Sequence, residues 1–414
     1  MELQRPTSSP VRLRAAREED LDALVTIHGA AFPDARGRDA RRRNFTENVR
    51  GSLSDLVVAE RAGTVVAHAF LFRMSTWIGG AELPVGGVAS VGVAPEWRGH
   101  GIGRELIRGL HDELRARGTG LALLYPFRHA FYRRLGYGSV AEVKRLRVPP
   151  AALPGLSARG DTRAAGHDDG AAVRSCYQRV AQRSTGMLSR REPVWRAALS
   201  PEGRHAVVVP DGHGGISGYA LYTYLAAPDG LAQEIDVLEL VAETDAARLS
   251  LLGFLARQRD QVPYVRLVVD AHDPLAMFCD EPRAPTTDSI RSLVAIAGDV
   301  GVGAMLRLVD VRGALGGRGY ACDGELTLRI TDAELTGGAT TGTLVVSHGR
   351  GSFGPARPGP SMTTDAVTFA QIYAGAVTAT QAARYGRAEC SDGDALDLAD
   401  RLFATAPFFT LDIF

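Results

Sequence analysis

The sequence has few cysteines, no long apolar run and no excess of charge of either sign. Only four cysteines occur among 414 residues, and no two of them form a C-x-x-C pair. This pattern predicts neither a disulfide framework nor a zinc site and is typical of buried thiols in a reducing compartment. No segment approaches the length of a membrane span, and the first residues lack the apolar core of a secretion signal. We therefore expect a cytoplasmic soluble protein.

The positive and negative charges balance. Lys and Arg together number 47, as do Asp and Glu, so the formal net charge is zero. A protein built around nucleic acid or an anionic membrane surface would carry a strong positive excess. We therefore expect no nucleic-acid partner, and any basic cluster is a local feature. No group of His, Cys or carboxylate residues has the spacing of metal ligands, so we also expect no metal.

The length and the order of the elements predict three domains. Strands and helices alternate over 1–150, which is typical of an α/β domain with a mixed sheet. A stretch rich in Pro, Gly and Ala follows, and 151–300 then repeats the same order of elements. In 301–414, two strands precede two helices, and the chain ends in the apolar segment "APFFTLDIF". Because most chain ends are polar and frayed, we expect this terminus to pack against another part of the molecule.

One nine-residue segment carries the strongest chemical signal. "PEWRGHGIG" (95–103) follows an apolar strand and precedes a helical pattern with apolar residues at 102, 106, 110 and 114. A helix N-terminus attracts anions, glycines let the backbone approach a phosphate, and Arg98 adds positive charge. Arg98–Gly103 fits neither the Walker pattern nor G-x-G-x-x-G. A glycine-rich surface turn has the same composition, so the segment alone leaves both interpretations open.

The surrounding sequence favours the anion site. R-x-x-G-x-G at the start of a helix resembles the pyrophosphate-binding motif of the GCN5-related N-acetyltransferases (GNATs). The segment "LLYPFRHAFYRRLGYG" (123–138) resembles the next strand and helix of that superfamily. The whole chain resembles the Eis (enhanced intracellular survival) family. This resemblance implies α/β and α+β folds: two tandem GNAT-like mixed-sheet domains, the second degenerate, and a C-terminal sterol-carrier-protein-like domain. Its further motifs are "GMLSRREPVW" (186–195), "LRLVDVRGALGGRGY" (306–320) and "LFATAPFFTLDIF" (402–414).

The resemblance implies an N-acetyltransferase that uses acetyl-CoA. The pyrophosphate would lie on the amides of the glycine-rich turn, and the pantetheine would pair with the preceding strand like an added strand. The acceptor would be an amine of a small molecule or of a lysine side chain. The cofactor-binding residues implied are Val91, Val93, Arg98, Gly99, His100, Gly101, Ile102, Gly103 and Phe127.

Acetyl transfer from a thioester to an amine needs a base, a group that stabilises the oxyanion and a proton donor for the thiolate. Tyr132 stands where the superfamily has a tyrosine that protonates the thiolate, and the family implies that the α-carboxylate of Phe414 is the base. Backbone amides near Val91 would bind the oxyanion. Structural alternatives stay open: Tyr132 as a half-buried aromatic, and a tail that packs only against its own domain.

For the acceptor pocket, the resemblance implies Phe32, Asp34 and Tyr125. The structural alternatives are that Phe32 is the hydrophobic end of the first helix and Asp34 a turn residue. The sequence does not identify the acceptor amine.

The chain departs from the family pattern at three neighbouring positions. Phe127 replaces a hydroxyl that is expected near the cofactor, although its backbone can still serve. Arg128 and His129 place positive charge beside the site unless they point to solvent. Because positive charge disfavours polycationic substrates, we do not expect aminoglycosides to be good acceptors.

A non-catalytic protein that binds or senses acyl-CoA or an apolar ligand is the alternative function. An intact turn together with Tyr132 favours the enzyme, because a sensor does not need a proton donor. The resemblance also implies a homo-oligomer, either a trimer or a hexamer.

Overall fold

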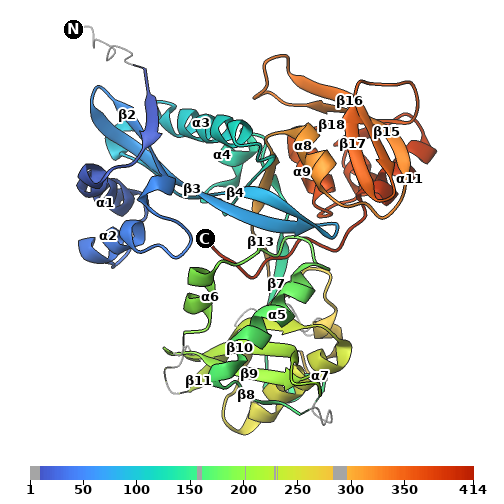
Figure 1. Ribbon diagram of the computed structural model, residues 1–414. Helices are drawn as coiled ribbons and strands as arrows, with labels where there is room; N and C mark the ends of the chain where they lie inside the picture. The colour runs from blue at the N-terminus through green and yellow to red at the C-terminus, as the bar shows by residue number, and fades with distance from the viewer. Residues whose placement is uncertain (1–9, 156–160, 201, 228–229, 231, 283–295) are drawn as a thin grey trace.

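Three mixed sheets organise the molecule, and each takes most of its strands from one part of the chain (Figure 1). The computed structural model describes residues 10–155, 161–200, 202–227, 230, 232–282 and 296–414. None of the helices within these ranges combines the length and the apolar character needed to cross a membrane.

The first sheet has the order β1-β2-β3-β4-β5-β14-β6, with helices on both faces. Residues of α1 and α2 pack with Phe70 and Phe72 on one face, and α3 packs with Ala69 and Leu71 on the other. The strands are β1 (Arg12–Ala15), β2 (Leu56–Arg61), β3 (Thr64–Ile78), β4 (Ala81–Val93), β5 (Leu121–Leu124), β6 (Gly138–Ser139) and β14 (Met305–Leu308), and the helices are α1 (Leu21–Ala31), α2 (Arg38–Thr46), α3 (Ile102–Ala116) and α4 (His129–Arg133).

The second sheet repeats this plan in the order β13-β7-β12-β11-β10-β9-β8. Its α5 packs against one face and α7 against the other, and β11 and β12 are parallel like β4 and β5. The strands are β7 (Glu142–Val148), β8 (Arg163–Ala164), β9 (His205–Pro210), β10 (Ile216–Ala226), β11 (Gln233–Ala242), β12 (Val265–Asp270) and β13 (Gly298–Val302), and the helices are α5 (Gly170–Ala181), α6 (Glu192–Ala198) and α7 (Asp245–Ala256).

The third sheet has the order β17-β16-β15-β18-β19. Its helix α9 shares one apolar core with strands of the first sheet, because Phe369 and Ile372 cluster with Leu123 and Leu306. The strands are β15 (Gly324–Thr331), β16 (Ala339–Ser347), β17 (Arg350–Gly354), β18 (Ser361–Asp365) and β19 (Ala388–Cys390), and the helices are α8 (Val311–Gly317), α9 (Ala366–Tyr373), α10 (Ala379–Arg384) and α11 (Gly393–Phe403).

The predicted domain boundaries at 150 and 300 do not follow the sheets. Strand β7 precedes residue 150 but pairs with β12 in the second sheet, and β14 follows residue 300 but lies between β5 and β6 in the first. Both strands are short and apolar on at least one face, so their sequences show that they are strands without showing which sheet they join. The first two sheets are therefore tied together by these strands.

The C-terminal segment leaves the third domain and runs between the first and second sheets (Figure 1). After α11 it passes the second domain, where the amide of Phe409 donates to the carbonyl of Thr185 at 2.8 Å. Its end lies beside the first sheet, as its contacts in the next section show.

Candidate active site

The glycine-rich turn between β4 and α3 presents a set of unpaired amides. Gly99 and Gly101 have φ angles of 81° and 84°, which only glycine adopts without strain. In the described part of the chain, the amides of Gly99, Gly101, Ile102 and Gly103 donate to no other group. Such amides at the start of a helix form an anion site, so the turn has the geometry needed for a pyrophosphate.

The side chain of Arg98 connects this turn to neighbouring elements through two hydrogen bonds. Its Nε donates to the carbonyl of Val93 at 3.2 Å, and its Nη2 donates to the carbonyl of Ala30 at 2.8 Å. The side chain of Arg98 is exposed, as is that of His100, whose Nδ1 lies 3.1 Å from the Arg98 carbonyl. Arg98 thus links the turn to β4 and to α1.

Strands β4 and β5 separate directly below the turn. Their parallel pairing covers Val85–Val88 and Leu121–Leu124 and then stops, although β4 continues to Val93. On the opposite side, the register with β3 shifts within 89–92, and Ser90 has a φ of 49°. This bulge and the separation leave the β4 backbone around Val91 and Val93 without a partner strand on the β5 side. An extended chain such as pantetheine fits beside such an edge.

Tyr132 lies in α4, which follows β5. The side chain is 2% exposed, and its ring centroid lies 5.0 Å from that of Phe131 and 5.7 Å from that of Tyr137. Burial raises its pKa, so the phenol is protonated at neutral pH. Phe131 also faces the turn, because a Cβ on Gly103 would lie 3.5 Å from its ring. Tyr132 is therefore fully buried and not half-buried, and α4 lies next to the anion site.

Phe414 lies where β4 and β5 separate. Its ring centroid is 5.5 Å from that of Tyr125, which directly follows β5. A Cβ on Gly87 of β4 would lie 3.2 Å from the Phe414 ring and 2.4 Å from Met74, so only glycine leaves room for both side chains. The tail therefore packs against the first domain and not only against its own.

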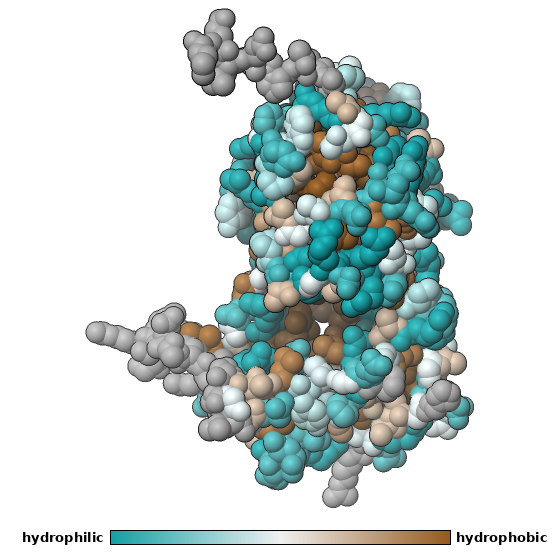
Figure 2. Space-filling model, turned by 90° about the vertical axis from the view of Figure 1, so that its left-hand side faces the viewer, coloured by the Kyte–Doolittle hydropathy of each residue, from teal (hydrophilic) through white to brown (hydrophobic). Residues whose placement is uncertain are grey.

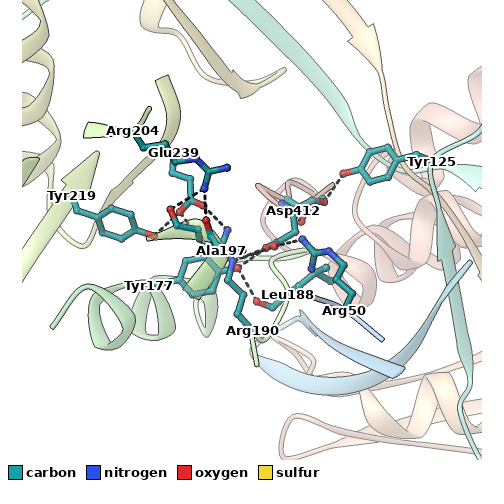
Figure 3. Close-up of polar contacts among 12 residues, drawn as sticks. Arg50, Tyr125, Tyr177, Leu188, Arg190, Ala197, Arg204, Tyr219, Glu239 and Asp412 are labelled. Atoms are coloured by element: carbon teal, nitrogen blue, oxygen red, sulfur yellow. Dashed lines mark hydrogen bonds and ion pairs between the residues drawn. The ribbon is translucent and has the colours of Figure 1, made fainter. Parts of the chain in front are cut away.

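Two residues before the end, Asp412 is the centre of a buried polar cluster (Figure 3). Its Oδ1 accepts a hydrogen bond from Arg50 Nη2 at 2.8 Å, and its Oδ2 accepts one from Arg190 Nε at 2.9 Å. The Tyr177 hydroxyl lies 3.1 Å from the same Oδ2, and Arg190 also pairs with Glu239 at 2.8 Å. These five residues, called the Asp412 cluster below, come from all three parts of the chain and hold the tail in place.

Tyr125 adds a further contact to the tail. Its hydroxyl donates to the backbone carbonyl of Asp412 at 2.9 Å, and burial raises its pKa to about 12. The sequence pointed to Tyr125 only as an acceptor-pocket residue. The sequence analysis missed the Asp412 cluster. The signal that could have pointed to it is the single acid, Asp412, in the mostly apolar segment "FFTLDIF".

Replacing Asp412 with Asn tests whether the cluster holds the tail. The change leaves Arg50 and Arg190 in a buried site with less compensating charge, and breaking such a pair costs about 3 kcal/mol. We expect a lower urea midpoint and a lower kcat, because the tail loses its anchor. The matched control is Asp397→Asn, at an exposed position of α11. Equal midpoints for the two variants would contradict a structural role for the cluster.

The two predicted acceptor residues at the end of α1 are largely occupied by other contacts. The ring of Phe32 lies 4.7 Å from that of His28. Asp34 accepts hydrogen bonds from Arg36 Nε at 2.6 Å and from Arg41 Nη2 at 2.8 Å, and the bond from Arg36 is the main cause of its lowered pKa. With two guanidinium partners, Asp34 adds little net negative charge to the pocket.

The residues before α4 form the outer wall beside Tyr132. The Phe127 ring is 65% exposed, and its centroid lies 5.5 Å from that of Tyr132. Arg128 is exposed to solvent, whereas His129 is half-buried. Phe127 therefore covers one edge of the Tyr132 ring from the solvent side.

A cavity of about 340 Å³ opens between the first and second domains near the end of the tail. Met74, which packs beside Phe414 over Gly87, is part of its wall. An opening between the two halves of the molecule, with hydrophobic residues around it, is visible in Figure 2. The charged wall residues are four arginines and one acid: Arg50, Arg73, Arg190, Arg191 and Glu82. Within the described ranges, no group of three or more His, Cys, Asp or Glu residues is arranged to hold a metal ion.

A substitution in the turn tests the anion site. At the φ of Gly101, an alanine costs about 1–2 kcal/mol, and the turn relieves this strain by moving its amides. We expect the Kd for acetyl-CoA, measured by calorimetry, to rise about 5- to 30-fold in Gly101→Ala. Gly118→Ala introduces similar strain, at a φ of 69°, at the far end of α3 and serves as the control. An unchanged Kd in Gly101→Ala would contradict the assignment of the turn.

Comparison with known proteins agrees with this geometry. An acetyltransferase (GNAT) domain model matches residues 12–140, a second acetyltransferase (GNAT) domain model matches 186–308, and a sterol carrier protein domain model matches 311–410. The N-acetyltransferase Eis of Mycobacterium tuberculosis (strain ATCC 25177 / H37Ra) is 25% identical over 420 residues, which are 95% of this chain and 97% of that protein.

Two further proteins resemble this chain, one over part of its sequence and one in its fold. An uncharacterized N-acetyltransferase of Streptomyces coelicolor is 31% identical over 279 residues, which are 64% of each chain. The crystal structure of a GCN5-related N-acetyltransferase from Anabaena variabilis superimposes with a TM-score of 0.84 at 23% identity, covering 98% of this chain and all of the other. The predicted arrangement of two GNAT-like domains and a sterol-carrier-like domain is confirmed.

Proposed function

Since the chain belongs to the Eis family of GCN5-related N-acetyltransferases, we propose that it acetylates an amine of a small molecule or of a lysine side chain, with Tyr132 as general acid and the α-carboxylate of Phe414 as general base. The observation that carries this proposal is the position of Phe414. Its ring contacts Tyr125 and adjoins Gly87, at the point where β4 and β5 separate. These contacts place the end of the tail beside the strands that would bind acetyl-CoA.

The residues present fit acetyl-CoA. Four unpaired amides of the turn, from Gly99 to Gly103, would hold its pyrophosphate, and the unpartnered edge of β4 at Val91 and Val93 would hold its pantetheine. When bound, acetyl-CoA supplies a thioester whose carbonyl carbon is open to attack by an amine. The backbone amide of Val91, next to the bulge at Ser90, would stabilise negative charge on the carbonyl oxygen.

Tyr132 and Phe414 would divide the proton transfers between them. The raised pKa of Tyr132 keeps its proton available for the leaving thiolate, and the rings of Phe127 and Phe131 exclude water from it. The carboxylate of Phe414 would accept the proton of the attacking nitrogen, and the Phe414 ring beside Tyr125 and Met74 would hold it in position.

The charges near the tail favour acceptors with a single amine over polycations. In the cavity wall, Arg50 and Arg190 are paired with acids of the Asp412 cluster, which leaves Arg73 and Arg191 against the single acid Glu82. The charge of Asp34 is shared by Arg36 and Arg41. Because like charges disfavour binding, we expect aminoglycosides to be poorer acceptors than monoamines.

Release of CoA from acetyl-CoA, followed with a thiol reagent, tests the function. We expect the rate to increase when monoamines or lysine peptides are added and to increase less with aminoglycosides. If acetyl-CoA binds but no amine accelerates CoA release, the chain is instead the acyl-CoA sensor that the sequence left as an alternative.

The family resemblance also supports a homo-oligomer, a trimer or a hexamer, and a cytoplasmic location. The four cysteines are all free thiols, in agreement with a reducing compartment. Light scattering coupled to size-exclusion chromatography measures the number of chains directly.

A further inference from the structure

A second opening between parallel strands lies in the second domain, outside the site described so far. Strands β11 and β12 pair over Ile235–Val237 and Val265–Leu267. In the described part of the chain, β11 then continues to Ala242 with no strand paired on that side. Leu238 is an extra residue in the register with β10, so β11 bulges where it leaves β12. This arrangement repeats that of β4 and β5, where the pantetheine of acetyl-CoA would lie.

A cavity of about 320 Å³ occupies this opening, and we call it the second-domain cavity. Cavities that hold small ligands in proteins measure about 300–1,000 Å³. Its wall includes residues of β11, β12 and the start of α7, together with Phe409 and Leu411 of the C-terminal segment. It shares no lining residue with the cavity near Phe414. The second-domain cavity is therefore a separate place for a small ligand.

Apolar side chains that remain partly exposed form one part of its wall. Val268 is 46% exposed although β12 lies between β7 and β11 in the sheet. Leu240 of β11 and the tail residues Phe409 and Leu411 are half-buried. Since the removal of apolar surface from water favours binding, these side chains favour a ligand with an apolar portion.

Acidic side chains form the other part of the wall. The charged residues there are four acids and one arginine: Glu243, Asp245, Asp270, Asp273 and Arg248. Arg248 neutralises Asp273, with Nη2 at 2.5 Å from Oδ2, and Arg179 forms an ion pair with Glu243. Among the described residues, Asp245 and Asp270 form no ion pair with a basic side chain. Asp270 accepts a hydrogen bond from the His272 amide at 2.9 Å. The wall thus keeps the charge of two carboxylates, which favours a cation.

The start of α7 differs from the glycine-rich turn of the first domain in the same sense. Helix α7 has Thr244 as its N-cap and Asp245 in its first turn. The Thr244 hydroxyl accepts a hydrogen bond from the Ala247 amide at 3.1 Å, which occupies one of the amides that an anion would need. The Asp245 carboxylate offsets the positive end of the helix dipole. Because these acids repel phosphates, the cavity is not a second copy of the acetyl-CoA site.

We propose that the second-domain cavity binds a small organic cation, an alkylammonium ion with an apolar chain. The chain lies between β11 and β12 against Val268, Leu240 and the tail, and the cationic group lies beside Asp245 and Asp270. Because Phe409 and Leu411 belong to the segment that ends at Phe414, the ligand also packs against the docked tail. Binding is non-covalent and needs neither acetyl-CoA nor acetyl transfer.

Hexyltrimethylammonium tests this site, because it is a permanent cation with an apolar chain and has no N–H group to acetylate. Carbon-13 labelling of the methionine methyl groups distinguishes the two cavities, since Met187 lines the second-domain cavity and Met74 lines the one near Phe414. We expect the Met187 signal to shift in a saturable way when the cation is added to the full-length protein. Hexanoate, with a similar chain and the opposite charge, should leave the Met187 signal unchanged.

Two variants connect the shift to the cavity and to its charge. Val268→Trp fills the cavity from a partly exposed position and should raise the Kd about tenfold or more. The double variant Asp245→Asn/Asp270→Asn should raise the Kd about threefold or more, because two attractive charges are lost.

The matched control for the double variant is Asp394→Asn/Asp397→Asn. It changes the net charge equally at exposed positions of α11, where Asp394 is also in the first turn of its helix. Its Kd should equal that of the wild type, and melting curves confirm that each variant is folded.

Three results would overturn the proposal: no shift of the Met187 signal, an equal shift with hexanoate, or an unchanged Kd in folded Val268→Trp. Equal changes of Kd in the two double variants would also overturn it, because the charge effect would then not come from the cavity. Each of these results leaves the acetyltransferase proposal intact, and a failure of acetyl transfer does not change the binding result.

Discussion

Replacing Tyr132 with Phe is expected to lower kcat for acetyl transfer by about a hundred- to ten-thousand-fold, the usual contribution of a general acid. The change removes only the hydroxyl, and the ring contacts with Phe127, Phe131 and Tyr137 remain possible. The fold and the Kd for acetyl-CoA should therefore change little. The rate of CoA release at saturating acceptor measures the effect, with calorimetry for the Kd.

A neighbouring tyrosine provides the matched control for this prediction. Tyr137 is also fully buried, but its hydroxyl is paired with His111. Tyr137→Phe should lower the melting temperature, because it leaves His111 without its partner, and should keep kcat within about twofold. A kcat for Tyr132→Phe equal to that of the wild type would mean that another group protonates the thiolate.

The second large effect is expected from adding a single glycine after Phe414. The extension moves the terminal carboxylate by up to about 3.6 Å, while the Phe414 ring keeps its contacts with Tyr125 and Met74. The Asp412 cluster still holds the tail. We expect kcat to fall about a hundredfold or more with little change in melting temperature, because only the base has been displaced.

The control for the extension changes the tail without moving its carboxylate. Ile413 is 78% exposed, so Ile413→Ser removes little packing and keeps the chain length. Its kcat should match that of the wild type. Full activity of the extended chain would exclude the terminal carboxylate as the base, even if the Tyr132 prediction holds.

Local sequence signals predicted most of the first domain correctly. Helix α3 begins at Ile102, as the apolar spacing at 102, 106, 110 and 114 indicates. Helix α2 has no such signal. Its sequence "RDARRRNFT" is almost entirely polar, and one of its two buried residues, Arg41, is charged. An apolar period therefore could not reveal it.

The parts that the sequence did not predict depend on contacts between distant residues. The strands β7 and β14 are recognisable as strands, but they pair with strands more than a hundred residues away in the sequence. Asp412 and Arg50 are separated by 362 positions, and no spacing rule links them. The sequence could point to the turn and to α4 because their motifs are local, whereas the anchor of the tail exists only in the folded chain.

Transfer of a labelled acetyl group from acetyl-CoA to an added monoamine, compared in the wild type and in the glycine-extended chain, tests the central claim most directly. We predict that the label appears on the amine nitrogen with the wild-type protein and about a hundredfold more slowly with the extended chain, while both bind acetyl-CoA equally. The claim is that the protein acetylates amines with its terminal carboxylate as the base. It would be contradicted if both proteins labelled the amine at the same rate, or if neither labelled it despite tight binding of acetyl-CoA.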